Sequence, residues 1–302
     1  MSEQLFIGLD IGGGSAKIGV VDASGAILAR DRILVVEGQT FEQILSAYIA
    51  SIETLLGGAK PSGIGIGFPG HILADLATGA NGNVPVLDGK PIAETFARHF
   101  GCKARLLNDA DAGALAESRF GTGRGVGRLM LITVGTGIGV SLVVDGVPFS
   151  AANGTLGDAG HVVLVSDNPV RCRQGCLGCL ESVASGEALE VKALALFPNA
   201  AEGTATASLV RAAIAGQPGA MALIAEAGRW IGMAAATWCN IFAPDRILIG
   251  GGISAVGAPL VAAIRDEAHR RTIPYNVHHT DFALAGLGNN AGIIGAAAAV
   301  ML

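Results

Sequence analysis

The stretch Leu5–Asp22, LFIGLDIGGGSAKIGVVD, has the same pattern as the stretch Leu129–Asp145, LMLITVGTGIGVSLVVD. Each consists of an apolar run, a glycine-rich turn and a second apolar run that ends in aspartate. A Rossmann dinucleotide loop would open a helix after its glycines, whereas Ile18, Val20 and Val21 favour a second strand here. The repeat therefore predicts two related halves, each built on a β-hairpin.

The glycine-rich turns suggest what these hairpins bind. Backbone N–H groups in such a turn can converge on a phosphate anion, although an ordinary hairpin with glycines at positive φ explains either turn alone equally well. Two hairpins facing each other across a cleft could hold a polyphosphate from both sides. The repeat as a whole therefore favours nucleotide binding.

Composition limits the class of protein. The chain has 302 residues, of which 51% are hydrophobic, only 5% are aromatic and 45 are glycine, so we expect an α/β protein of two domains. A net charge of −5 argues against nucleic acid as the main partner. No apolar run reaches the roughly 18 residues of a membrane span, and no basic region precedes the first apolar stretch. We expect a cytoplasmic protein.

Strand and helix patterns alternate along the rest of the chain. Helices are predicted at 40–56, 91–99, 110–120, 187–196, 206–215, 218–242, 259–271 and 290–302, with further strands at 27–36, 63–68, 104–107, 246–249 and 282–287. Residues 71–89 are predicted to form a long polar loop. A glycine-rich linker at 121–127 predicts a first domain of residues 1–120 with the C-terminal helix 290–302, and a second domain of residues 121–289.

Three of the five cysteines lie close together, at Cys172, Cys176 and Cys179, and His161 lies just upstream. Three thiolates and an imidazole suit a tetrahedral zinc site. Four unrelated residues in a surface loop are the alternative, and a disulfide is disfavoured in a reducing compartment.

The same stretch resembles the zinc motif of the ROK family (repressors, open reading frames, sugar kinases), G-E-x-G-H followed by C-x-C-G-x-x-G-C-x-E. The corresponding segments here are GDAGH at 157–161 and CRQGCLGCLE at 172–181. Asp158 stands where the family usually has glutamate, and Gln174 stands where a cysteine is expected, so we infer that Cys176 replaces that ligand. Further motifs occur in family order: DIGG at 10–13, FPG at 68–70, NVP at 83–85, NDA at 108–110, GTGIG at 135–139 and GGGIS at 250–254.

The resemblance implies the two-domain actin-like (ribonuclease H-like) ATPase fold, an α/β fold with a cleft between the domains. It also implies transfer of the ATP γ-phosphate to a hexose hydroxyl, with Asp109 as general base, most simply on the 6-OH. The implied sugar ligands are Asn83, Asn108, Asp158, His161 and Glu181. The implied phosphate ligands are Gly12, Gly13, Ser15, Lys17, Gly135, Thr136 and Gly137, with Gly251 and Gly252 under the adenosine. The implied metals are Mg²⁺ at Asp10 and structural Zn²⁺ at His161, Cys172, Cys176 and Cys179.

Several alternatives stay open. In the first hairpin, Gly14–Lys17 replaces the family's usual short Thr-Lys. The hairpin is similar in length to that of polyphosphate-using glucokinases of the family, so both ATP and polyphosphate stay open as the donor. Glucose is the default sugar, but Asp158 is one methylene shorter than glutamate, which sets its carboxylate about 1.5 Å further back. N-acetylhexosamine kinase and fructokinase therefore remain alternatives, as does a non-catalytic sugar-binding regulator.

A repressor would need an N-terminal helix-turn-helix, whereas the first strand starts at Leu5. A homodimer is only the family tendency.

Overall fold

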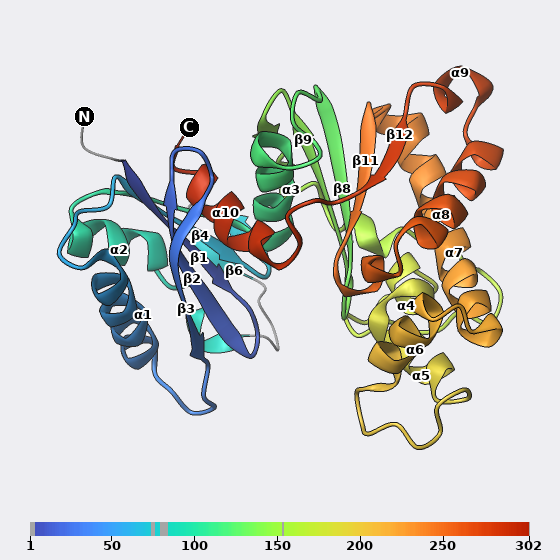
Figure 1. Ribbon diagram of the computed structural model, residues 1–302, viewed down its shortest axis with the longest axis horizontal. Coiled ribbons are helices and arrows are strands. Elements are labelled where there is room, and N and C mark those ends of the chain that lie inside the picture. The colour runs from blue at the N-terminus through green and yellow to red at the C-terminus, as the bar shows by residue number, and fades with distance from the viewer. Residues whose placement is uncertain (1–3, 74–75, 79–83, 153, 302) are drawn as a thin grey trace. The chain divides into compact units, whose positions relative to one another are not determined.

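The computed structural model describes residues 4–73, 76–78, 84–152 and 154–301. The chain forms two compact units (Figure 1). Unit 1 comprises residues 1–125, 141–157 and 287–302, and unit 2 comprises residues 126–140 and 158–286. Residues 141–157, which the sequence analysis assigned to the second domain, thus belong to unit 1.

Unit 1 is built on a five-stranded sheet that contains the first glycine-rich hairpin. In spatial order its strands are β3 (Ile27–Leu34), β2 (Ser15–Asp22), β1 (Leu5–Ile11), β4 (Gly63–Phe68) and β7 (Lys103–Asn108). Strands β1, β2 and β3 are antiparallel, whereas β4 and β7 run parallel to β1. The predicted strand–turn–strand unit is confirmed.

Helices cover both faces of this sheet (Figure 1). Helices α1 (Phe41–Leu56) and α2 (Ile92–Phe100) bury their apolar faces in the core on one side. Helix α10 (Ala291–Ala298) packs on the other side, where it contacts α3 (Asp109–Phe120). The start of α1 was readable from the sequence because Thr40 and Gln43 form a capping box.

Glycines allow α10 to approach the sheet closely. Strand β4 reads GIGIGF, with its isoleucines in the core beside α1. A Cβ at Gly65 would overlap the carbonyl group of Ala296 in α10, and a Cβ at Gly8 in β1 would overlap that of Ile293. The two backbones can meet at this distance only because these positions carry no side chain.

The second sheet contains the second hairpin. In spatial order its strands are β10 (Val147–Pro148), β9 (Ile138–Val144), β8 (Arg128–Val134), β11 (Arg246–Gly250) and β12 (Asp281–Leu284). The helices of unit 2 are α4 (Leu180–Ala184), α5 (Gly186–Ala193), α6 (Ala205–Ile214), α7 (Pro218–Phe242), α8 (Ala258–Arg271) and α9 (Pro274–Val277).

The predicted loop at 71–89 is wrong in part. The segment contains the antiparallel strands β5 (His71–Leu73) and β6 (Leu76–Thr78), followed by the short helix η1 (Pro85–Leu87). Strands of three residues are too short to show a period of two, so the pattern could not reveal them. Across the described residues no single helix is long and apolar enough to cross a membrane; only α6 and α7 taken together, bent by 105°, meet that criterion by length and composition.

Candidate functional site

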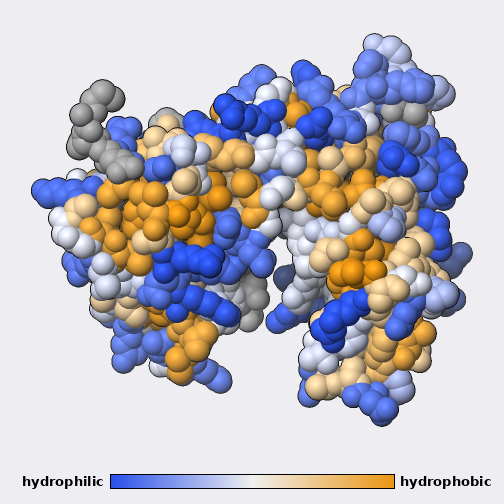
Figure 2. Space-filling model, viewed as in Figure 1, coloured by the Kyte–Doolittle hydropathy of each residue, from blue (hydrophilic) through white to orange (hydrophobic). Residues whose placement is uncertain are grey.

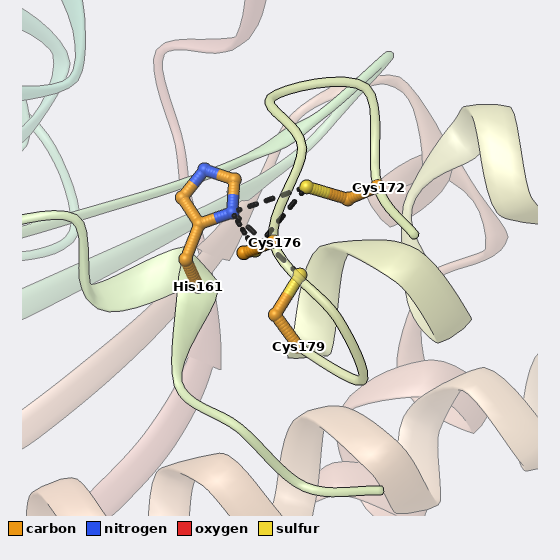
Figure 3. Close-up of side chains that lie close together, drawn as sticks. All are labelled: His161, Cys172, Cys176 and Cys179. Atoms are coloured by element: carbon orange, nitrogen blue, oxygen red, sulfur yellow. Dashed lines mark hydrogen bonds between the residues drawn. The ribbon is translucent and has the colours of Figure 1, made fainter. Parts of the chain in front are cut away.

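The four predicted zinc ligands come together in unit 2 (Figure 3). Nδ1 of His161 lies 3.3 Å from Sγ of Cys176 and 3.6 Å from Sγ of both Cys172 and Cys179. The sulfurs of Cys172 and Cys176 are 3.3 Å apart. The imidazole points its Nδ1 edge at the thiols and its other nitrogen away from them (Figure 3).

A short knuckle of backbone presents the thiols. The amide of Cys172 donates to the carbonyl of Cys176 over 2.9 Å, and the amide of Gly175 donates back to the carbonyl of Cys172 over 3.0 Å. Gly175 has φ +98° and Gly178 has φ +66°, a region that favours glycine. The glycines that fall between the cysteines therefore shape the loop that gathers them.

The geometry and chemistry of this cluster fit zinc. With Zn–S bonds of about 2.3 Å and a Zn–N bond of about 2.0 Å, the ligand atoms of a tetrahedral site lie about 3.5–3.8 Å apart. Two of the separations in the structure, at 3.6 Å, lie within this range, and two, at 3.3 Å, are slightly shorter. The placement of Cys176 supports the inference that it replaces the cysteine missing at Gln174.

Glu181 links this region to the second glycine-rich hairpin. It lies in the first turn of α4, two residues after Cys179, and its carboxylate accepts a 3.0 Å hydrogen bond from the backbone N–H of Ile138. A Cβ at Gly137 would overlap the same carboxylate. The second oxygen of Glu181 has no hydrogen bond among the described contacts, so it can accept one from a ligand.

Asp158 and His161 flank a single turn of 3₁₀-helix, η2 (Ala159–His161). The amide of His161 donates to the Asp158 carbonyl over 2.8 Å. Gly160, within the turn, packs directly on the backbone of Ile138. The turn therefore fixes Asp158 and His161 relative to the start of β9, on the same segment that Glu181 contacts.

Asn108 and Asp109 occupy the junction between β7 and α3. The Asn108 side-chain oxygen accepts from the amides of Ala110 at 2.8 Å and Asp111 at 3.3 Å, and its side-chain nitrogen donates to the Gly70 carbonyl at 2.8 Å. Asn108 is therefore the N-cap of α3, as its position after a strand suggests. The second N–H of its side-chain amide makes no hydrogen bond among the described contacts.

Asp109 is the first residue of α3 and has a modified acidity. The residue is solvent-accessible, yet enough protein surrounds the carboxyl group that loss of water raises its pKa from 3.8 to about 6. The negative charge of Asp10, and more weakly that of Asp111, acts in the same direction, against the hydrogen bond from the Ala110 amide. Such a carboxylate is a stronger base than an ordinary aspartate and is still largely ionised at pH 7.

The first hairpin brings a carboxylate and a cation together. Lys17 Nζ lies 3.4 Å from an Asp10 carboxylate oxygen, and the side chains are 42% and 19% exposed. The turn closes with a 3.0 Å bond from the Gly12 amide to the Ser15 carbonyl. Carboxylate oxygen is a ligand that Mg²⁺ prefers, so Asp10 is chemically suited to its predicted role.

The other predicted phosphate and nucleotide positions are also backbone turns. Gly135, Thr136 and Gly137 connect β8 to β9, and the Gly135 carbonyl accepts from Gly186 at the start of α5 over 2.7 Å. Gly251, with φ +83°, packs on the backbone of Val134 after β11, whereas a Cβ at Gly252 would meet open space. Gly13 lies in the turn between β1 and β2, and Asn83 lies outside the described residues.

Comparisons with known proteins identify the family. The ROK family matches residues 6–301, so the chain belongs to the ROK family. It is 31% identical to a glucokinase of Thermotoga maritima over 99% of this chain and 98% of that one. A ROK glucokinase structure from Streptomyces griseus, in complex with glucose and AMPPNP, matches with a TM-score of 0.80 and 30% identity, covering 97% of this chain and 98% of that one. A xylose repressor of Caldicellulosiruptor bescii is 27% identical over 98% of this chain and 77% of the repressor.

These matches confirm the predicted family and the two-domain actin-like α/β fold. The glucokinase relatives support the prediction of a sugar kinase. Sequence reasoning missed one residue beside the first hairpin and one buried acid in α3. Arg32 in β3 hydrogen-bonds Ser15 of the first hairpin, and Glu117 in α3 is fully buried. Only the alternation of charge along β3 hinted at Arg32, and no pattern pointed to Glu117.

Proposed function

We propose that this ROK protein phosphorylates a hexose with ATP, with glucose as the first candidate and the 6-OH as the acceptor. The observation that carries the proposal is Asp109. A carboxylate stands at the first residue of α3, with its pKa raised to about 6 by loss of water and by Asp10. A sugar hydroxyl is a poor nucleophile, and a positioned base of suitable pKa is the group that such a reaction needs.

The reaction balances as an in-line phosphoryl transfer. As the sugar oxygen forms its bond to the γ-phosphorus, the bond from that phosphorus to the β–γ bridging oxygen breaks, and ADP leaves. The hydroxyl proton passes to the Asp109 carboxylate. Because the transition state is loose, most of the catalysis is positioning and charge neutralisation.

The remaining site residues would orient the two substrates. We assign hydrogen bonds to the other sugar hydroxyls to Asn83, Asn108, Asp158, His161 and Glu181. The free oxygen of Glu181 and the outward nitrogen of His161 are suited to this role. The phosphates would lie on the two hairpins, against Gly12, Gly13, Ser15 and Lys17 and against Gly135, Thr136 and Gly137. Gly251 and Gly252 would lie under the adenosine.

Two metals belong to the proposal. Asp10 would hold Mg²⁺, which when bound offsets the charge of the donor phosphates. His161, Cys172, Cys176 and Cys179 would hold a structural Zn²⁺, which fixes the loop between Asp158 and Glu181. The protein would act in the cytoplasm, without a nucleic-acid partner, and as a homodimer if it follows the family tendency.

A coupled assay over a hexose panel, with ATP and polyphosphate as alternative donors, tests the proposal. Asp109→Asn should lower kcat by about 10²–10⁴-fold, while sugar binding by calorimetry persists. Asp266→Asn, an exposed aspartate in α8, is the matched control. For the wild type, kcat/KM should fall as pH drops through about 6, because protonated Asp109 cannot accept a proton. Undiminished turnover in Asp109→Asn would remove Asp109 as the base.

The same panel separates the alternatives. A preference for N-acetylated sugars or fructose would fit the shorter Asp158 side chain, and turnover with polyphosphate would identify the other donor. The match to a xylose repressor keeps a sugar-binding regulator as a second candidate. Sugar binding without turnover on any donor would favour it.

A further inference from the structure

The β2–β3 ribbon of unit 1 carries an unusual pairing of like charges. Lys17 in β2 lies directly opposite Arg32 in β3 in the strand register. Directly opposed residues of antiparallel strands project to the same face, with Cβ atoms about 4.5–5.5 Å apart, and like charges in this arrangement are destabilising. A local arrangement that opposes stability often marks a functional position.

The guanidinium of Arg32 is held at the glycine-rich turn. Its Nε donates a 3.0 Å hydrogen bond to the Ser15 hydroxyl at the start of β2. The Gly12 amide donates to the carbonyl of the same Ser15, and the Val35 amide donates to the Gly14 carbonyl over 3.2 Å. These bonds fasten the first residues of β2 and the end of β3 together, so the arginine points at the turn that is expected to bind phosphate.

The positive charge of Arg32 is not balanced by an ion pair within the described residues. Within the described part of the chain, no carboxylate is within ion-pairing distance of its guanidinium. Its neighbour Asp31 projects to the other face of the strand and accepts a 2.7 Å hydrogen bond from Ser51 of α1. The Asp10 carboxylate forms its ion pair with Lys17. One face of the ribbon therefore carries a net positive charge in a chain whose net charge is −5.

A third cation extends this face. Arg30 lies two residues before Arg32, so both side chains project to the same side of β3. Arg30 also lines a groove of about 380 Å³ with Asn290 and Ile294 at the start of α10. Figure 2 shows hydrophilic surface over the middle of the β2–β3 ribbon, with apolar surface toward the start of β3.

Edge protection alone does not explain the arrangement. Strand β3 is the edge of its sheet, and charged residues on edge strands discourage pairing with other chains. That role requires only an exposed charge. It accounts neither for an arginine opposite a lysine nor for the hydrogen bond that aims Arg32 at the turn.

We propose that Arg32 binds a phosphate group of the phosphoryl donor, together with Lys17, on the outer side of the Gly12–Ser15 turn. The inference rests on the proposed kinase function. The ligand chemistry is a condensed phosphate chain, from either ATP or inorganic polyphosphate. Arginine suits this role because its planar fork donates several hydrogen bonds to phosphate oxygens. Arg30 continues the cationic face for a chain longer than a triphosphate.

Direct binding tests the proposal without catalysis. Calorimetry with sodium tripolyphosphate and with ATP would be run on wild type, Arg32→Gln, Arg32→Lys and Arg105→Gln. Arg105 is the matched control because it is an exposed arginine on β7, the other edge strand of the same sheet. Arg32→Gln should weaken binding about 10- to 100-fold, Arg32→Lys should recover part of it, and Arg105→Gln should bind as wild type does.

Turnover provides the second measurement. Arg32→Gln should raise the KM of the donor while leaving the KM of the sugar unchanged, a separation that general damage to unit 1 would not produce. Weaker binding of tripolyphosphate alone would assign Arg32 to polyphosphate recognition. Weaker binding of both tripolyphosphate and ATP would assign it to the phosphate chain that the two donors share. Either result supports the proposal. If Arg32→Gln binds the donor as Arg105→Gln does and has the same donor KM, the proposal is overturned. If wild type phosphorylates no sugar but Arg32→Gln still loses phosphate binding, the site stands and the kinase assignment fails.

Discussion

Replacing Asp111 with asparagine should make the stability of unit 1 rise, relative to wild type, as pH increases. Asp111 lies in the first turn of α3, is only 4% exposed, and accepts a hydrogen bond from the equally buried Ser141 hydroxyl. Burial raises the pKa of Asp111 from 3.8 to about 6, although the Ser141 hydrogen bond acts in the opposite direction. The folded protein therefore holds this proton more tightly than the unfolded chain does.

The sign and size of the effect follow from that difference. A carboxyl group whose pKa is raised on folding contributes stability that is fully present below pH 3.8 and is lost as pH rises through about 6. At about 1.4 kcal/mol per pKa unit, the complete contribution is about 3 kcal/mol, of which about half is present at pH 5. Asparagine does not ionise. The stability of Asp111→Asn relative to wild type should therefore rise by about 3 kcal/mol between pH 3.5 and pH 8.

Measuring the stability difference between Asp111→Asn and wild type at two pH values cancels every contribution that does not depend on pH. The asparagine amide gains a donor that needs a partner, which changes the stability by the same amount at every pH. Both tryptophans, Trp230 and Trp238, lie in α7 of unit 2, so intrinsic fluorescence would not report on unit 1. Hydrogen exchange of peptides from β1 and α3 in increasing urea would report on it. Asp266→Asn, an exposed aspartate, should show no such trend, and a pH-independent difference for Asp111→Asn would refute the reasoning.

Two further predictions concern the metal and the packing of α10. Wild type should contain about one zinc per chain, and Cys176→Ser should lose it on dialysis because one of four ligands is gone. Metal analysis should show that Cys102→Ser, outside the cluster, keeps zinc; no zinc in carefully prepared wild type would contradict the site. Gly65→Ala should destabilise unit 1 by about 1–3 kcal/mol, because its Cβ overlaps the backbone of α10. Gly14→Ala, whose Cβ would meet open space, should unfold at nearly the urea concentration of wild type, and equal midpoints for the two variants would contradict the packing argument.

Local patterns in the sequence predicted most of the fold. The hairpins, the capped helix α1 and the alternating β4 each carry their signal within about 20 residues, where the spacing of apolar residues and glycines is readable. The cysteine cluster was equally local, because its thiols lie within eight residues and the glycines between them shape the turn. The short pair β5 and β6 was missed because three-residue strands have no readable period.

Features that depend on distant partners were not predictable. Gly65 is explained by Ala296 of α10, which lies 231 positions further along the chain. Arg32 reads as one of several charges on an edge strand until the register places it opposite Lys17 and its side chain reaches Ser15. The alternation of side chains along β3 is readable from the sequence, but the pairing of β3 with β2 is known only from the sheet.

Helix α3 is the clearest example of features that depend on distant partners. Its three acidic residues look alike in the sequence, but their surroundings in the structure differ. Asp109 opens the helix with a raised pKa and no buried partner, as a proton acceptor requires. Asp111 accepts a hydrogen bond from the hydroxyl of Ser141, the residue at which the chain re-enters unit 1. Glu117 is fully buried and accepts hydrogen bonds from the amides of Thr122 at 3.0 Å and Leu287 at 2.7 Å.

Those partners give α3 a role beyond that of a core helix. The chain leaves unit 1 after Gly125, re-enters at Ser141 and enters for the last time at Leu287. The two buried carboxylates of α3 hold the chain near all three points, and each accepts hydrogen bonds that would otherwise leave a buried donor or charge unpaired. A single rigid helix thus connects the proposed base to the segments that join unit 1 to the rest of the chain. Glu117 thus accepts hydrogen bonds from both the segment that leaves unit 1 and the segment that returns to it.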